Sequence, residues 1–561
     1  MHARKFGRHQ GGRMPGLLSA AALMLLVLGC ASGPVQVRAG QAPRIRNVIF
    51  LIPDGMSISA MGLARWVQGG ENLAMDELVC GLVRTYNADT PIADSAPAGS
   101  AFATGYKTNS PYIGVLPRAG GLWGVPEPEA PMRPAVTVLE AARLAGKATG
   151  LVTTCDISNA TPAAFSAHTA NRKNTEDILE QEVYNGLSVV FSGGYKFLAG
   201  KNRKDNEDLA AELLNQGYTY ITTRKDFDAL KTGTAGESPL VWGLFAPVDL
   251  AYDIDRDSAA EPSLEEMTEK AIRLLSADKD GFFLMVEGSK IDWAAHANEP
   301  ACLAREIIAF DRAVRQALAF AKSRDDTIVI VASDHGTGGV TIGDKSTASG
   351  YDTISLETFI APLRMAKKSG AVFASLVKED RSNLEEVLAN VYGIKGLTEE
   401  ERELVKTTKL DAYNGMILIG KLLSGRARLG FTTAGHTGDE VCLCLYAPTG
   451  SPRLGGTVQN SDIAWYISDM LGLKLKECAK LLYQDAETIA RATGATAETD
   501  LADLANPVLV LRKSGTELRF PVNKNYCLGE GAKRQLSGVT VYIPETKSWY
   551  VASDAAAYLG K

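Results

Sequence analysis

The sequence predicts an α/β protein, a three-layer α/β/α sandwich with a mostly parallel central sheet, and two observations support this fold class. First, five short apolar runs have the composition of buried strands. These runs are 47–52, 149–154, 282–286, 327–332 and 441–446. Second, segments with helical periodicity separate the runs, and strands that alternate with helices are typical of a parallel sheet covered on both faces.

The bulk composition is that of a globular protein. The chain has 561 residues, of which 45% are hydrophobic and 22% charged, and its formal net charge is −6. This length is enough for one large α/β domain with insertions. No basic run stands out after the N-terminal segment, so we do not expect nucleic acid as a partner.

The N-terminal segment has the pattern of an export signal. A basic stretch over 1–16 precedes an apolar run over 17–29, which is too short to span a bilayer comfortably. The run ends in "VLGC", which resembles a bacterial lipoprotein signal with Cys30 as the lipidated residue; ordinary signal cleavage nearby is the alternative. We therefore exclude residues 1–40 from the fold. We expect an exported protein, either periplasmic or anchored to the outer membrane through Cys30, and otherwise secreted.

Seven cysteines follow Cys30. An exported protein permits disulfides, but an odd number leaves at least one thiol unpaired unless it pairs between chains. Cys442 and Cys444 lie on one face of a predicted strand at a separation that is long for a bridge. We predict that these two are buried thiols.

Residues 91–105 are nearly all small, with Asp94 and Ser95 before a short predicted helix. Pro97 in the first turn and Gly105 just past the end fit such a helix. Ser is among the best N-cap residues, so a cap is the ordinary interpretation of Ser95. A nucleophile is the alternative.

Polar side chains gather around the ends of the predicted strands. They are Asp54 after the first strand; Asn159, Thr161, His168 and Arg172 beyond the second; Glu287, Asp292 and His296 after the third; Asp334 and His335 after the fourth; and His436 before the fifth. Ligands of open α/β sheets bind beyond the carboxyl ends of the strands, so this pattern predicts a site at that edge.

The residue types favour divalent metals. Histidine together with aspartate suits zinc, and sets of oxygen atoms suit magnesium. Asp292 and His296 are four residues apart, so one helical turn directs both at a single ion.

Six motifs together are specific enough to identify a family. They are "PDG", "DSAPAGSAFATGYKTN", "NATPAAFSAHTANR", "VEGSKIDWAAHANEP", "SDHGTGG" and "TAGHTG". Their order and spacing resemble those of alkaline phosphatases, over about residues 47–446. The resemblance implies hydrolysis of phosphate monoesters at a site with two Zn²⁺ and one Mg²⁺, a phosphoserine intermediate and a homodimer.

The resemblance also implies a role for each motif residue. Asp292, His296 and His436 match the ligands of the first zinc, and Asp54, Asp334 and His335 match those of the second. Asp54 also matches a magnesium ligand, with Thr161 and Glu287. Ser95 matches the nucleophile, Arg172 the residue that clamps the phosphate, and Asp94 the residue that helps to hold that arginine. His168 matches a structural residue outside the metal shell.

Two positions depart from the family. Asn159 stands where relatives carry Asp or His beside the magnesium, so we expect weaker or altered binding of the third metal. Trp293 stands where relatives carry Lys, His or Trp near the phosphate, and a Trp cannot hold phosphate by charge. We therefore expect weaker product inhibition than in relatives with Lys.

The remaining regions complete the predicted organisation. Residues 41–490 form the catalytic domain, with a helical insertion at about 345–430 that matches the crown-like insertions of the family. Residues 506–561 alternate like strands and predict a small β appendage, which binds surface polymer or acts as a structural cap.

Two other functions compete with a phosphomonoesterase. One is a phosphodiesterase or sulfatase of the same superfamily. The other is a non-catalytic lipoprotein that binds metal or phosphate. Because the sequence keeps Ser95, Arg172 and every matched ligand, it favours the enzyme.

Overall fold

The computed structural model describes residues 44–231, 236 and 238–560. The signal segment 1–40, Cys30 included, lies outside these residues, so export and lipidation stay predictions. In the described part of the chain, no helix combines the length and hydropathy that crossing a membrane requires.

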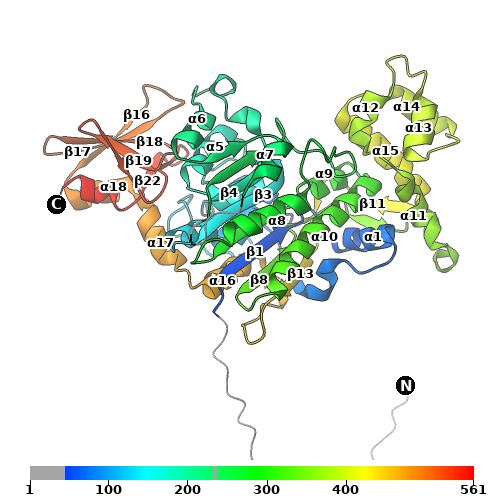
Figure 1. Ribbon diagram of the computed structural model, residues 1–561, viewed down its shortest axis with the longest axis horizontal. Coiled ribbons are helices and arrows are strands. Elements are labelled where there is room, and N and C mark those ends of the chain that lie inside the picture. The colour runs from blue at the N-terminus through cyan, green and yellow to red at the C-terminus, as the bar shows by residue number, and fades with distance from the viewer. Residues whose placement is uncertain (1–43, 232–235, 237, 561) are drawn as a thin grey trace, which may run out of the picture. The chain divides into compact units, whose positions relative to one another are not determined.

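The central element is a ten-stranded sheet (Figure 1). Its strands, in spatial order, are β14 (Gly456–Gln459), β2 (Val79–Arg84), β13 (Val441–Tyr446), β8 (Thr327–Ala332), β1 (Asn47–Ile52), β7 (Phe282–Glu287), β3 (Ala148–Asp156), β4 (Val189–Gly193), β6 (Val241–Leu244) and β5 (Thr219–Ile221). Neighbours are parallel except for β13, which runs antiparallel to both β2 and β8. The predicted α/β fold with a mostly parallel sheet is confirmed.

All five predicted strands belong to this sheet. Three of them, β1, β8 and β13, have the predicted bounds, and the other two lie within β3 and β7. Along β1, Ile49 and Leu51 enter one apolar layer, and Val48, Phe50 and Ile52 enter the other. Because successive side chains point to opposite faces and both faces are buried, the strand is apolar throughout.

Helices cover both faces of the sheet. The layer on the side of Ile49 contains α1 (Ile58–Gln68), α7 (Arg224–Ala229), α8 (Leu264–Leu275) and α10 (Pro300–Lys322). The layer on the side of Phe50 contains α2 (Ser95–Thr104), α3 (Val138–Leu144), α4 (Ala160–Ser166), α5 (Thr175–Tyr184), α6 (Leu209–Asn215), α16 (Asn460–Leu471) and α17 (Leu475–Leu482).

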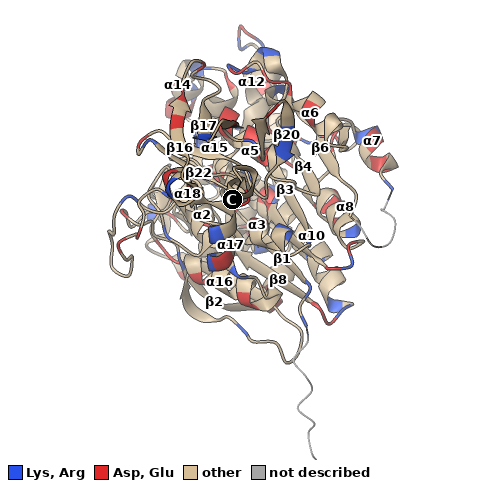
Figure 2. Cartoon of the chain, turned by 90° about the vertical axis from the view of Figure 1, so that its left-hand side faces the viewer, with Lys and Arg blue, Asp and Glu red and all other residues tan. Residues whose placement is uncertain are grey.

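Helix α8 illustrates how local sequence sets these elements. The Ser263 side chain accepts a hydrogen bond from the Glu266 backbone N–H, and the Glu266 carboxylate accepts from the Ser263 N–H. Met267 and Leu274 are buried against the sheet. Basic and acidic residues are mixed on α7 and α8 in Figure 2, as expected for helices with one face in water.

The predicted insertion is helical. It contains α11 (Leu356–Met365), α12 (Phe373–Leu376), α13 (Leu384–Tyr392), α14 (Glu399–Thr407) and α15 (Ala412–Arg426). Two short strands, β10 (Val340–Ile342) and β11 (Leu429–Phe431), pair antiparallel where the insertion leaves and rejoins the main domain. The buried side chains of Leu363, Phe373 and Ile419 continue the apolar layer that contains Ile49.

The C-terminal part is rich in strands, as predicted, but begins earlier than residue 506. Its larger sheet contains β16 (Thr496–Asp500), β17 (Val508–Lys513), β18 (Thr516–Pro521), β19 (Tyr526–Gly529) and β20 (Ala532–Gln535). A smaller sheet contains β15 (Gln484–Asp485), β22 (Ser548–Val551) and β21 (Val541–Ile543), and α18 (Ala486–Thr493) and α19 (Ala555–Tyr558) complete the part. Because β16 is a polar edge strand, it lacks the apolar alternation that marks β17.

The seven cysteines of the described chain form no disulfide. Cys442 and Cys444 are buried on one face of β13 with their Sγ atoms 3.8 Å apart. The prediction of two buried thiols on one face is confirmed.

Lys107 is a buried lysine that joins three segments of the chain. Its Nζ donates hydrogen bonds to the carbonyl oxygens of Tyr86 (2.7 Å) and Arg84 (3.3 Å) and to Asn460 Oδ1 (2.7 Å). All three acceptors are neutral, so burial lowers the pKa of Lys107 to about 7.

Because of this pKa, the free energy of unfolding depends on pH. Between pH 7 and the pKa of an unfolded lysine (about 10.4), the unfolded chain binds a proton here that the folded chain does not. Stability from this group therefore rises with pH. We expect the stability of wild type relative to Lys107→Met to grow between pH 7 and pH 10, measured by urea unfolding. The same difference at both pH values would contradict the assignment.

Candidate functional site

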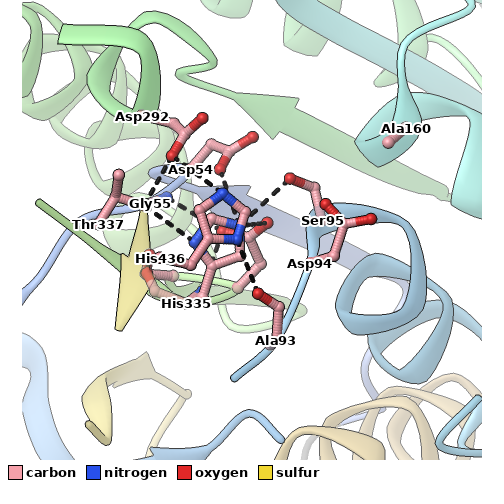
Figure 3. A network of polar contacts seen from close by, with 12 residues as sticks. Asp54, Gly55, Ala93, Asp94, Ser95, Ala160, Asp292, His335, Thr337 and His436 are labelled. Atoms are coloured by element: carbon pink, nitrogen blue, oxygen red, sulfur yellow. Dashed lines mark hydrogen bonds and ion pairs between the residues drawn. The ribbon is translucent and has the colours of Figure 1, made fainter. Parts of the chain in front are cut away.

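The polar residues predicted around the strand ends meet at one edge of the sheet. Asp54 and Asp334 follow β1 and β8, and Glu287 is the last residue of β7; these three strands are parallel neighbours. His436 begins β12 (His436–Thr437), which pairs with β9 (Gly336–Thr337) just after His335. Because β13 runs opposite to its neighbours, the residues before it reach the same edge as the residues after β8. Figure 3 shows this cluster with Ser95 beside it.

Two groups of side chains have the composition of metal sites. Asp292, His335 and His436 form one group, and Asp54, Asp334 and His335 form the other. In each group the candidate ligand atoms lie within 4.8 Å of one another, and His335 belongs to both.

His296 adjoins the first group. Asp292 and His296 lie on α9 (Lys290–His296), where the predicted helical turn brings His296 Nε2 to 3.2 Å from Asp292 Oδ2. His296 Nε2 is also 3.0 Å from His436 Nε2.

His296, His335 and His436 are each oriented by a hydrogen bond at Nδ1, the ring nitrogen that faces away from the cluster. The partners of Nδ1 are the Ala434 carbonyl for His296 (2.6 Å), the Ala93 carbonyl for His436 (2.7 Å) and Thr337 Oγ1 for His335 (3.2 Å). A carbonyl only accepts, so Nδ1 carries the hydrogen and the Nε2 lone pair points into the cluster. Two lone pairs 3.0 Å apart, as in His296 and His436, repel each other unless a positive charge lies between them.

Thr337 fixes the tautomer of His335. Its hydroxyl donates to Asp292 Oδ1 at 2.7 Å, so its oxygen accepts from His335 Nδ1. Burial and the charge of His436 lower the pKa of His335 to about 3, which keeps the ring neutral. Sequence reasoning did not single out Thr337, although it lies within the "SDHGTGG" motif.

The carboxylates of the site are buried close to one another. Burial, and then the charge of Asp334, raise the pKa of Asp54 well above its usual range. Burial also raises the pKa of Asp334 to about 6, partly offset by a hydrogen bond from the Gly55 N–H. Burial opposes ionisation of Asp292, but the histidines around it, wherever they carry a second proton, hold its pKa at about 2 through the hydrogen bond with His296 and through their charge.

Several oxygen atoms of the site have no hydrogen-bond donor. Asp54 Oδ1, Asp334 Oδ2 and Thr161 Oγ1 are buried without a hydrogen-bond partner. Buried polar atoms are costly when unpaired, and buried like charges are costly without a cation. This donor set, aspartate with neutral histidine, therefore fits divalent metals.

Glu287 lies in a polar pocket next to Asp54. Burial raises its pKa, and hydrogen bonds with Thr153 and Ser289 partly counteract that effect. Cys155 Sγ lies 3.4 Å from Glu287 Oε2. Thr153 and Cys155 were not predicted, because both lie inside an apolar strand where nothing in the sequence marks them.

Ser95, the first residue of α2, lies beside the metal groups. Its Oγ is 3.2 Å from His335 Nε2, and the residue is buried. The helix begins at Ser95, but Asp94 holds the N-cap position, with extended backbone and no capping hydrogen bond from its side chain. The interpretation of Ser95 as the cap is therefore wrong by one residue. Gly105 ends the helix in the left-handed conformation (φ 80°), as predicted.

Arg172 lies in the loop between α4 and α5 and is held by Asp94. Its Nη1 donates to Asp94 Oδ1 at 2.6 Å, and its Nη2 donates to Asn159 Oδ1 at 3.4 Å. Asn159 also caps α4, since the same oxygen accepts from the Ala160 N–H at 2.8 Å. The Asp94 carboxylate is thus engaged with Arg172 rather than with its own helix.

Two other predicted residues lie beside or away from the cluster. Trp293 is partly exposed on α9, and Lys290 Nζ lies 4.2 Å from the centre of its ring. His168 is buried away from both metal groups, with Nδ1 2.6 Å from the Gly114 carbonyl and Nε2 3.0 Å from Glu140 Oε1.

Comparisons with known proteins agree with the resemblance seen in the sequence. The family model described as alkaline phosphatase matches residues 45–473. Alkaline phosphatase 4 of Bacillus subtilis (strain 168) is 35% identical, over 81% of this chain and 96% of the relative. The repressible alkaline phosphatase of Saccharomyces cerevisiae is 32% identical, over 82% of this chain and 86% of the relative.

Solved structures give the same result. The cold-active alkaline phosphatase of a psychrophilic Shewanella species has a TM-score of 0.66 and 28% identity, covering 76% of this chain and 99% of its own. The Thermus thermophilus enzyme has a TM-score of 0.66 and 27% identity, covering 80% of this chain and 96% of its own. A mutant of the alkaline phosphatase from the Antarctic bacterium TAB5 has Mg bound in its M3 site. Its TM-score is 0.54 and its identity 25%, covering 77% of this chain and 100% of its own. Because the family match spans most of the sequence, the chain belongs to the alkaline phosphatase family.

Proposed function

We propose that this phosphomonoesterase acts through a phosphoserine at Ser95, in a site with two Zn²⁺ and one Mg²⁺. The placement of Ser95 carries the proposal: its Oγ lies 3.2 Å from His335, the residue shared by both metal groups. Arg172 is tied to Asp94, the residue next to Ser95 in the chain. Nucleophile, cation sites and phosphate clamp are therefore adjacent.

The donor atoms suggest how the metals are divided. Asp292, His296 and His436 would hold the first zinc, and Asp54, Asp334 and His335 the second. The three inward Nε2 lone pairs and the unpaired carboxylate oxygens support this division. When bound, zinc neutralises the charge of the phosphate and favours the ionised form of a nearby hydroxyl.

The third metal would be held by oxygen atoms alone. Asp54, Thr161 and Glu287 offer two carboxylates and a hydroxyl, which suit magnesium. The unpaired Thr161 Oγ1 supports this assignment, as does the magnesium found in the TAB5 relative. Asn159 contributes no charge here because its amide is neutral, and its oxygen already accepts hydrogen bonds from Ala160 and Arg172.

The chain's own residues then perform the chemistry. Ser95 Oγ forms a bond to phosphorus as the bond from phosphorus to the alcohol oxygen breaks, and water later hydrolyses the phosphoserine. The guanidinium of Arg172 can hold two phosphate oxygens at once. The N-terminal N–H groups of α2 add positive potential where Ser95 stands.

Export and dimer formation are also proposed. The basic and apolar N-terminal segment supports export, with Cys30 as a lipid anchor. An apolar cavity of about 300 Å³ between α1 and α11 supports a homodimer. Trp66, Ile342 and Leu356 line it with more than two fifths of each residue exposed.

The function is tested by ester hydrolysis. We expect the mature protein to hydrolyse a chromogenic phosphate monoester at alkaline pH with Zn²⁺ and Mg²⁺, and to lose this activity on chelation. Ser95→Ala should lower kcat by about a thousandfold or more, because the nucleophile is removed. A phosphodiester and a sulfate ester serve as comparison substrates. Faster turnover of either would assign a different substrate to the site, and no turnover of any ester by folded, metal-loaded protein would favour a binding protein.

The role of Asn159 is tested by Asn159→Asp. Asp keeps the helix cap and adds a negative charge beside Thr161, so we expect magnesium to bind about tenfold more tightly. Calorimetric titration with Mg²⁺ measures this binding directly, and Mg²⁺ dependence of activity accompanies it. Asn159→Ser, which keeps a capping oxygen without charge, is the control. Superimposable magnesium curves for wild type and Asn159→Asp would refute the idea.

The role of Trp293 is tested by Trp293→Lys. A new ammonium near the phosphate should lower the inhibition constant of inorganic phosphate by about two- to fivefold, the range for a partly exposed ion pair. It should also lower Tm, because it replaces a ring that contacts Lys290 with a like charge. Trp293→Phe keeps the ring as the control. Unchanged phosphate inhibition in Trp293→Lys would show that this side chain does not reach the phosphate.

A further inference from the structure

We propose that Asn523, in the C-terminal part of the chain, positions the phosphate-clamping Arg172 through Gln181 and His168. The family match ends at residue 473, so Asn523 lies outside it. The inference rests on the proposed role of Arg172. By this inference, the C-terminal part helps to position a residue of the active site instead of binding a surface polymer.

The side chain of Asn523 is buried and forms three hydrogen bonds with side chains of α5. It lies between β18 and β19, is 2% exposed and has a left-handed backbone (φ 63°), which Asn tolerates better than most residues. Its Nδ2 donates to Asp177 Oδ1 (3.0 Å) and Glu180 Oε2 (2.9 Å), and its Oδ1 accepts from Gln181 Nε2 (3.0 Å). One side chain thus satisfies three polar groups on successive turns of α5.

Gln181 transmits this contact to the loop that carries Arg172. Its Oε1 accepts from the His168 N–H at 2.8 Å, and its Nε2 donates to the His168 carbonyl at 3.1 Å as well as to Asn523. Gln181 is 2% exposed, so no water replaces these bonds. The backbone of His168 is therefore fixed on both sides by a residue that Asn523 holds.

The loop from His168 to Arg172 has further hydrogen bonds, both from its backbone and from the side chains of His168, Thr169 and Arg172. Thr169 pairs through its N–H and carbonyl with Ile113, and the Arg172 N–H donates to the Pro111 carbonyl at 2.9 Å. A loss of the Gln181 contact would remove both side-chain hydrogen bonds to the His168 backbone, at the start of this loop. Because a clamp must hold phosphate oxygens within a narrow geometry, a small shift of the loop weakens binding.

A second contact from beyond the family match supports the same loop. The Tyr483 hydroxyl donates to Glu140 Oε1, the same oxygen that lies 3.0 Å from His168 Nε2. Tyr483 directly precedes β15. Both the backbone and the ring of His168 are thus held by groups that the C-terminal part contacts.

The proposal is tested with Asn523→Ala in the full-length, metal-loaded protein. Calorimetry measures the Kd of inorganic phosphate, and kinetics with a chromogenic monoester give KM and kcat. We expect the Kd of phosphate to rise by about five- to tenfold, the effect of losing a buried hydrogen-bond contact, with KM rising in parallel and kcat changing less. Gln181→Met keeps the side-chain length, removes all three hydrogen bonds and provides a second variant if Asn523→Ala does not fold.

Asn525→Ala is the matched control. Asn525 also joins the C-terminal part to α5, by a 2.6 Å hydrogen bond to the Tyr184 carbonyl, but has no bond to Gln181. If Asn525→Ala and Asn523→Ala raise the Kd equally, the interface acts only through general stability and the proposal is overturned. In an Arg172→Ala background, Asn523→Ala should have no further effect on the Kd; an additional increase would also overturn it.

These results separate the inference from the proposed function. If wild type binds phosphate and hydrolyses the ester, and Asn523→Ala has the same Kd and KM, the inference alone fails. If wild type neither binds phosphate nor hydrolyses the ester, the proposed function fails and the inference with it.

Discussion

The burial of like charges at one edge of the sheet is the constraint on which the site depends. Asp54, Asp292 and Asp334 are each at most 5% exposed, and they lie within reach of one another. Burying such a cluster is costly without compensating cations, and the same residues form the two groups that fit metal ions. Three adjacent strands, β1, β7 and β8, hold the residues that converge there, so the sheet provides the rigidity that the chemistry requires.

His335 connects the parts of this site. It belongs to both metal groups, its ring stacks on His436 with centroids 3.7 Å apart, and its Nε2 faces Ser95. Thr337 determines which nitrogen of His335 is protonated, and the same hydroxyl binds Asp292. A change at any one of these residues is therefore felt by the others, which makes their effects on activity non-additive.

Sequence patterns predicted the sheet and most of the cluster, for a physical reason. A strand buried on both faces is apolar throughout, so β1 and β8 were found with their bounds, and polar residues at their ends were conspicuous. The reversed direction of β13, which brings His436 to the edge, cannot be derived from an apolar run. Contacts distant in sequence, such as that of Asn523 with Gln181, leave no local pattern, because both residues look like ordinary surface amides.

The C-terminal part attaches to α5 through directional polar contacts as well as apolar ones. A purely supportive cap would be expected to attach through apolar contacts, which are tolerant of small shifts. Here apolar contacts, such as that of Tyr184 with Tyr526, are joined by buried amides and charges: Asn523 with Asp177 and Glu180, and Lys524 with Glu180 at 2.8 Å. Buried polar contacts are directional and are costly when broken on one side, so they fix one orientation of α5. Because α5 directly follows the Arg172 loop, that orientation would also position Arg172 for its proposed role as the phosphate clamp.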